Sequence, residues 1–307
     1  MTRRAVLAAI AAATSQAGAQ QPAAQPPAGF RRETGPKPRS TPPICLYTDQ
    51  IPNEIGYDEM GGLMKTMGFD GADLVVQPGG HITPEHADLD FMRAIESMTG
   101  SGMDVFMVSV PYTSPADPTV RLAMQWGGQM GVPFFRPGHW KYGAVEVEQR
   151  LAEAQRDLSG FANIARVVGM SVGVHNATPD CVGAAIFDTN MIIRGMDPHL
   201  VGYDFDAGYA AAQGGPVGFA TLLKLAMPRL KMVTARDCYF KKEGEAWKLA
   251  ECPLGEGMVD WAGFFKTLAR AKFTGPISLQ VGYEGGLPAI KKDLAFLKKH
   301  VAGAYGG

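Results

Sequence analysis

LAEAQRDLSGFANIARVVGMSVGVHN, residues 151–176, contains the unit from which this chain is built. In its first part the apolar residues recur every three or four positions, which places them on one face of a helix. The residues on that face are Leu151, Ala154, Leu158, Phe161 and Ile164. The segment Met170–Val174 is a short apolar run, typical of a buried strand, and the polar residues His175 and Asn176 follow it. The unit is therefore a helix, a strand and a polar loop.

The same alternation extends in both directions, from Ile44 almost to the end of the chain. Short apolar runs alternate with segments of helical period, and the turns between them carry Gly, Pro and Asp. The predicted strands are Ile44–Thr48, Ala72–Val76, Asp104–Val110, Val132–Phe135, Met170–Val174, Leu200–Phe205, Met232–Ala235 and Pro276–Val281. Strand–helix alternation requires parallel strands joined by right-handed crossovers, and eight such units are the number needed for a closed barrel.

An open, doubly wound sheet is the main alternative to the barrel. Such sheets usually carry a Gly-rich G-x-G-x-x-G turn after the first strand. Here the corresponding turn reads Thr48-Asp49-Gln50-Ile51-Pro52. We therefore predict a single-domain (β/α)8 TIM barrel over residues 44–302, an ordinary length for this fold.

Composition places the chain among globular proteins without a polyanionic partner. Of 307 residues, 46% are hydrophobic and 19% charged, and the formal net charge is −1. A chain near neutrality has no overall attraction to nucleic acid or to an anionic membrane. The composition therefore gives no indication of nucleic acid as a partner.

The first residues are typical of an export signal. Arg3 and Arg4 precede a short apolar stretch and the small-x-small site Ala17-Gly18-Ala19, and no acidic residue occurs before Glu33. The paired arginines resemble the twin-arginine type. We predict a signal peptide over residues 1–20, a disordered Pro/Gln-rich linker over 21–43, and a periplasmic or secreted mature protein. The apolar run is too short to span a bilayer, and a disordered tail or a short amphipathic helix is the alternative.

The four cysteines form no metal-binding or redox motif. Cys45 and Cys181 lie beside apolar strand and helix patterns, which favours buried thiols. A disulfide between Cys238 and Cys252, across one loop, is the alternative that export would permit.

Polar residues gather where the predicted strands end, which in a barrel is the functional face. Four of the six histidines follow strands, and arginines and carboxylates accompany them. The candidates for substrate binding are His81, Arg136, His139, Trp140, Asn176, Tyr209, Arg236 and Gln280. A guanidinium at the mouth of a barrel suits hydroxyl, carboxylate or phosphate oxygens, and aromatic rings suit the faces of sugars. For Asp237, capping of a turn is as good an interpretation as catalysis.

Three segments resemble the xylose-isomerase-like barrel superfamily, which includes sugar phosphate isomerases and epimerases. They are Pro78–Glu85, Gly202–Gly215 and Cys252–Asp260, and the last resembles exported members of the family. The resemblance implies one divalent metal ion, Mn²⁺, Mg²⁺ or Zn²⁺, held by carboxylates and a histidine at the strand ends. It also implies an acid/base group that moves a proton on the carbon next to a carbonyl.

The metal ligands that the resemblance implies are only partly present. Asp206 and His175 match, but Thr234 stands in place of a histidine, and Gln280 or Gly282 in place of a glutamate. Neutral side chains bind a divalent cation more weakly than carboxylates do. The resemblance therefore implies a degenerate metal site made of Asp206 and His175.

Two functions remain open from the sequence. The first is an exported isomerase or epimerase acting on a sugar, cyclitol or keto-sugar, with His175, Asp206 and Asp237 as catalytic residues; a 3-keto-glycoside lyase or hydrolase is a variant. The second is a non-catalytic carbohydrate-binding barrel that has lost the metal. DNA repair of the endonuclease IV kind is disfavoured, because the chain is not basic and has few His and acidic ligands at the strand ends.

Overall fold

The structure, a computed structural model, describes residues 35–177 and 179–306. The predicted signal peptide and residues 21–34 of the predicted linker lie outside this range. Residues 35–43 of the linker lie inside it and contact the barrel: the Arg39 guanidinium pairs with Asp70 at 2.7 Å, and the Pro43 carbonyl accepts from Ile277 N–H. We had expected the whole linker to be disordered, but its last residues contact the barrel.

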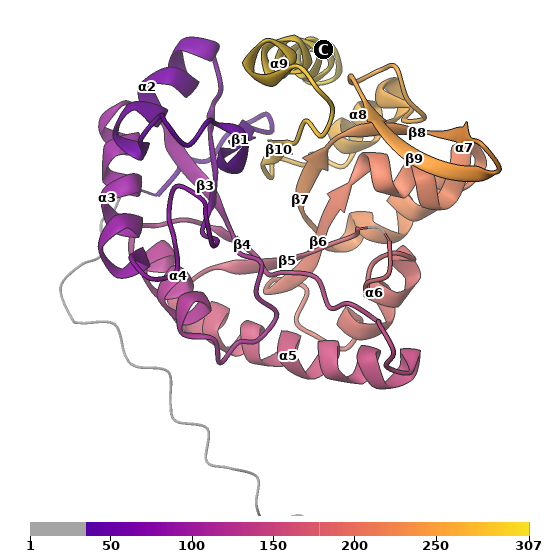
Figure 1. Ribbon diagram of the computed structural model, residues 1–307, viewed down its shortest axis with the longest axis horizontal. Helices are drawn as coiled ribbons and strands as arrows, with labels where there is room; N and C mark the ends of the chain where they lie inside the picture. Colours follow the sequence, from indigo (N-terminus) through magenta and orange to yellow (C-terminus); the bar gives the residue numbers. More distant parts are fainter. Residues whose placement is uncertain (1–34, 178, 307) are drawn as a thin grey trace, which may run out of the picture.

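Eight parallel strands close into a barrel in the order β1-β10-β7-β6-β5-β4-β3-β2 (Figure 1). The strands are β1 (Ile44–Tyr47), β2 (Gly71–Val75), β3 (Asp104–Ser109), β4 (Phe134–Arg136), β5 (Ser171–His175), β6 (Val201–Asp206), β7 (Leu230–Ala235) and β10 (Ile277–Leu279). Each overlaps a predicted strand, so the (β/α)8 fold is confirmed. Most strand residues are buried, since one face lines the barrel interior and the other packs on helices.

In the described part of the chain, eight helices surround the barrel, one after each of its strands (Figure 1). They are α2 (Tyr57–Met67), α3 (Ala87–Gly100), α4 (Pro118–Gln129), α5 (Val147–Val168), α6 (Ile186–Ile193), α7 (Ala207–Ala226), α8 (Trp261–Arg270) and α9 (Gly286–Tyr305), and the 3₁₀ turns are η1 (Thr48–Gln50) and η2 (Met227–Arg229). In α5 the predicted apolar face is the buried one: Leu151, Ala154, Leu158 and Phe161 face the core. None of the helices in the described part of the chain combines the length and apolar character needed to cross a bilayer.

A two-stranded antiparallel hairpin interrupts the barrel between β7 and α8 (Figure 1). It consists of β8 (Asp237–Glu243) and β9 (Ala246–Cys252), joined by a tight turn in which Gly244 has a φ of +62°. We had expected a plain loop here, with buried thiols favoured and a Cys238–Cys252 disulfide as the alternative. In the hairpin Cys238 pairs with Glu251 and Asp237 with Cys252, and all four cysteines of the chain are free, buried thiols.

Candidate active site

A cavity of about 620 Å³ opens at the carboxyl ends of the barrel strands. Its walls combine aliphatic and proline side chains with basic groups. The polar and aromatic residues that line it are Tyr47, Gln77, Ser109, Arg136, His139, Lys141, His175, Asp180, Tyr209, Arg236 and Gln280. Six of the predicted site residues are therefore brought together: Arg136, His139, His175, Tyr209, Arg236 and Gln280.

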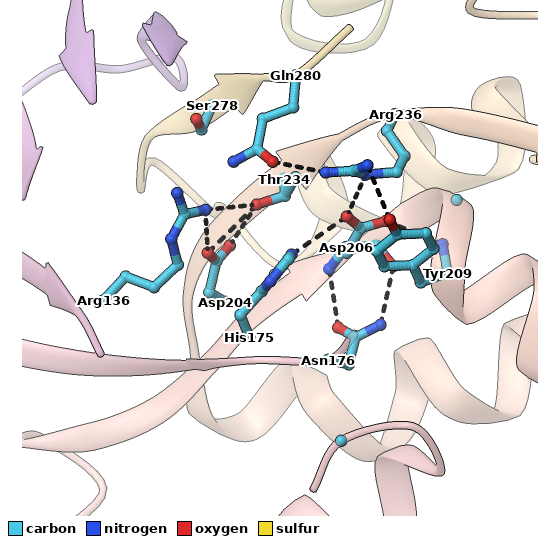
Figure 2. A network of polar contacts seen from close by, with 12 residues as sticks. Arg136, His175, Asn176, Asp204, Asp206, Tyr209, Thr234, Arg236, Ser278 and Gln280 are labelled. Atoms are coloured by element: carbon cyan, nitrogen blue, oxygen red, sulfur yellow. Dashed lines mark hydrogen bonds and ion pairs between the residues drawn. The ribbon is translucent and has the colours of Figure 1, made fainter. Parts of the chain in front are cut away.

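Arg136, the last residue of β4, forms part of the cavity floor but points into a buried ionic network (Figure 2). Its guanidinium nitrogens lie 3.2 Å from a carboxylate oxygen of Asp73 and 3.2 Å from one of Asp204. The Thr234 hydroxyl accepts from the same guanidinium and donates to Asp204. Both carboxylates are fully buried, so the Arg136 guanidinium neutralises their charge inside the barrel.

Asp206 ends β6 and is also the N-cap of α7, where its Oδ1 accepts from Tyr209 N–H at 2.9 Å. The Oδ2 atom lies 3.1 Å from His175 Nε2 and 2.8 Å from Arg236 Nε (Figure 2). Asn176 brackets the Asp206 backbone, accepting from its N–H and donating to its carbonyl. Burial raises the pKa of Asp206, and the Arg236 guanidinium and the N–H of Tyr209 act against that rise. These donors favour the ionised form of the carboxylate.

The Arg236 guanidinium lies beside Asp206 and has four partners (Figure 2). Besides the bond from Nε to Asp206, Nη1 donates to the Tyr209 hydroxyl at 2.9 Å and to the Glu251 carboxylate, and Nη2 donates to Gln280 Oε1 at 2.6 Å. Its carbon Cζ also lies 4.4 Å from the centre of the Tyr209 ring. The side chain is therefore fixed in position, although it still lines the cavity.

Two imidazoles face each other at the cavity wall. His175 Nδ1 and His139 Nε2 are 3.5 Å apart, and the ring centroids are 5.2 Å apart. Burial, together with the positive charges of Arg136 and Arg236, lowers the pKa of each histidine to about 3. Both rings are consequently neutral at physiological pH, and each retains one nitrogen that can accept a proton.

The family profile described as "Xylose isomerase-like TIM barrel" matches residues 62–300. The chain belongs to this family. Among curated proteins, none matches it.

Solved structures of the same barrel share its fold at low identity. A D-tagatose 3-epimerase-like protein is 16% identical with a TM-score of 0.68, over 86% of this chain and 98% of its own. The apo 3-keto-D-glucoside 4-epimerase from E. coli is 15% identical with a TM-score of 0.66, over 84% and 99%. A Mycobacterium smegmatis protein of the family, in complex with magnesium, is 15% identical with a TM-score of 0.66, over 86% and 98%.

The side chains at the expected metal position do not fit a divalent cation. Asp206 and Gln280, which the family resemblance aligns with metal ligands, both accept hydrogen bonds from Arg236, and the Thr234 hydroxyl is bonded to Asp204. Among the described residues, no group of three or more His, Cys, Asp or Glu side chains is arranged to hold a metal. We therefore assign no step of a reaction to a metal ion.

Asp237, expected to act in catalysis, instead holds the loop after the hairpin. Its carboxylate accepts from the backbone N–H groups of Gly255 and Val259 and from Trp261 Nε1, and it does not line the cavity. Arg236 and Asp237 are consecutive in an extended chain, so their side chains point to opposite sides. The interpretation of Asp237 as a structural cap is the one that its contacts support.

Three expected substrate-binding residues also lie apart from the cavity. Trp140 is 4% exposed, with its Nε1 bonded to Asp157 at 2.8 Å, so it cannot stack on a sugar. His81 Nε2 lies 3.2 Å from the Pro52 carbonyl, and Asn176 is occupied with the Asp206 backbone. These residues brace the loops around the cavity.

Glu251 contacts two of the site residues but was not among the residues predicted from the sequence. It belongs to β9, and its carboxylate accepts from Arg236 and from the Tyr209 hydroxyl at 3.2 Å. Alternating residues around the Gly244 turn are the signal that could have predicted the hairpin. The contact between Glu251 and a barrel residue could not have been predicted, because it depends on how the hairpin packs.

Proposed function

We propose that this chain is an exported enzyme of the sugar isomerase/epimerase type. It would move a proton on the carbon next to the carbonyl of a sugar, cyclitol or keto-sugar held in the cavity. The observation that carries the proposal is the chain of contacts Asp206–His175–His139, which begins at a buried carboxylate and ends at the cavity. The names of the similar structures, a tagatose 3-epimerase-like protein and a 3-keto-glucoside 4-epimerase, support this class of substrate.

The partners of each nitrogen define where a proton can be accepted. An ionised Asp206 requires the proton of His175 on Nε2, which leaves His175 Nδ1 as an acceptor. Because that nitrogen faces His139 Nε2, the proton of His139 is on Nε2. His139 Nδ1 is then the unprotonated end of the chain, and we assign it as the base.

The reaction needs a second group that stabilises the oxygen of the enolate. Gln280 turns its Oε1 to Arg236, since a guanidinium only donates, and its Nε2 is buried without a partner among the described residues. A carbonyl oxygen placed against this amide would gain negative charge as the base removes the proton, where hydrogen-bond donors stabilise it most. Return of the proton to the other face gives an epimer, and to the neighbouring carbon an isomer. Loss of a substituent on the next carbon makes the same site a 3-keto-glycoside lyase.

The test is exchange of substrate hydrogen with solvent. Ketoses and 3-keto-glycosides are incubated in D₂O with the wild type, and deuterium on the carbon next to the carbonyl is followed by NMR. His139→Gln and His175→Gln are expected to slow exchange by about 100-fold or more, the usual contribution of a general base. His199→Gln, an exposed histidine before β6, is the matched control and should leave exchange unchanged. Absence of exchange from every sugar would refute the proposal.

A non-catalytic sugar-binding barrel remains the second candidate, favoured by one observation. Asp180 is the one carboxylate among the described residues that line the cavity, so acid/base chemistry depends on the two imidazoles. Saturable sugar binding without deuterium exchange would establish that role instead.

Export is part of the proposal and has its own test. Replacing Arg3 and Arg4 by lysines is expected to retain the chain in the cytoplasm, because the twin-arginine route reads that pair. Fractionation of cells expressing the wild type and the variant measures this. Equal distribution of the two would argue against the twin-arginine route.

A further inference from the structure

We infer that the Arg236 guanidinium is the resident cation of this site and occupies the position that the family resemblance gives to a divalent metal. Its role in binding the carbonyl oxygen of the substrate rests on the proposed function; its occupation of the cation position does not.

Arg236 donates hydrogen bonds to side chains that would otherwise face a metal. Asp206 from β6 and Gln280 after β10 are two of the strand-end positions that the resemblance aligns with metal ligands, and both accept from the guanidinium. Figure 2 shows the guanidinium between them, with Tyr209 alongside. The side chain is 11% exposed, so the charge lies largely out of contact with solvent.

The eighth barrel strand lacks the expected carboxylate, and Glu251 of the hairpin places a carboxylate there instead. The resemblance places a glutamate at Gln280 or Gly282, and neither position is acidic. Glu251 reaches from β9 to this place: a Cβ added to Gly282 would overlap the Glu251 carboxylate. The carboxylate therefore fills the volume that a side chain at position 282 would need, and it pairs with Arg236.

The first turn of α7 leaves room for the arginine stem. A Cβ added to Gly208 would lie 2.6 Å from Arg236 Cγ and 2.8 Å from the Arg236 carbonyl oxygen, both closer than side chains pack. Gly208 and Gly282 thus flank one ion pair, the first making space for the cation and the second for its carboxylate. Two such accommodations indicate that the site is built around the guanidinium.

This cation keeps the capacity to bind an oxygen. A guanidinium has five N–H donors, and the bonds to Asp206, Tyr209, Glu251 and Gln280 use four, leaving one on Nη2. The unpartnered Gln280 Nε2 lies on the other side of the same amide. The ligand suited to these donors is a neutral sugar with a carbonyl or hydroxyl oxygen directed at Gln280, and no dissociable ion is required to bind it.

The experiment measures metal binding by the whole chain, without any substrate. Wild type, Arg236→Ala, Arg236→Lys, Asp206→Asn and the double variant Arg236→Ala/Asp206→Asn are dialysed against Zn²⁺ or Mn²⁺, and bound metal is determined by elemental analysis. The wild type and Arg236→Lys are expected to hold well under one equivalent. Arg236→Ala should bind at least about tenfold more tightly than the wild type, equivalent to about 1.4 kcal/mol, because Asp206 and Glu251 lose their cation. The double variant should lose that gain.

Two results would overturn the inference. One is a wild type that binds one equivalent which Asp206→Asn removes, since a metal would then displace the guanidinium. The other is a folded Arg236→Ala that binds no more tightly than the wild type. If Arg236→Ala does not fold, the wild-type comparison with Asp206→Asn still decides. Because the readout needs no turnover, a failure of the proposed function, seen as absent deuterium exchange, is distinguishable from a failure here.

Discussion

Replacing Arg136 by methionine should destabilise the barrel strongly, because it leaves two buried carboxylates without their cation. The Asp73 and Asp204 side chains are fully buried, and each lies 3.2 Å from a guanidinium nitrogen. Breaking a buried ion pair by removing one partner costs about 3–5 kcal/mol, which for a domain of this size lowers the melting temperature by about 10 °C. Ser109 and Ser278 donate hydrogen bonds to Asp73, which reduces the cost of leaving this carboxylate without its cation.

Urea unfolding followed by circular dichroism at pH 7 measures the loss. A second variant, Arg136→Met/Asp204→Asn, removes one of the two unpaired charges. It should recover a substantial part of the unfolding free energy that Arg136→Met loses. Burial already raises the pKa of Asp204 in the wild type, and removal of Arg136 raises it further. Because the pKa of Asp204 is higher in the folded state than in the unfolded state, the folded state is stabilised as the pH falls. The loss of unfolding free energy in Arg136→Met should therefore shrink between pH 7 and pH 5. A loss below about 1 kcal/mol at pH 7, or one unaffected by Asp204→Asn, would refute the reasoning.

Three further perturbations follow from the same contacts. Because burial lowers the folded pKa of His139 and His175 to about 3, below the unfolded value of about 6.5, stability is lost as the pH falls through that window, by about 1.4 kcal/mol per unit for each histidine. His139→Gln should flatten this slope in urea titrations, and a slope equal to that of the wild type would contradict it. Asp237→Ala should cost about 3 kcal/mol by leaving its loop N–H groups unpaired; lost exchange at unchanged stability would instead make Asp237 catalytic. Gly282→Ala should cost about 1–3 kcal/mol by displacing Glu251, as overpacking does. Gly62→Ala, in helix α2 with open space around its Cβ, should not destabilise the protein in the same urea titrations, because alanine is the better helix former.

The fold could be predicted because its signals are local. Strand segments such as Met170–Val174 are short and largely apolar, and the apolar residues of the helices between the strands recur every three or four positions. Polar residues at strand ends, His175 and Asp206 among them, were predicted to gather because a parallel barrel brings all carboxyl ends to one face.

The direction of each polar side chain could not be predicted in this way. Arg236 and Asp237 are neighbours in sequence, yet one lines the cavity and the other holds a loop. Trp140 follows a strand end but turns its indole towards Asp157. Glu251 reaches the site only because the hairpin folds back on α7, a packing arrangement that no local pattern contains.

The claim that His139, His175 and Arg236 carry out proton transfer without a metal ion can be tested directly. The measurement is the rate at which the wild type exchanges hydrogen next to a keto group in D₂O with excess chelator present. If a neutral imidazole pair and a fixed guanidinium do the chemistry, exchange persists in the chelator and falls by about 100-fold in His139→Gln. Exchange that chelator abolishes and Mn²⁺ restores, or that His139→Gln leaves unchanged, would contradict the account.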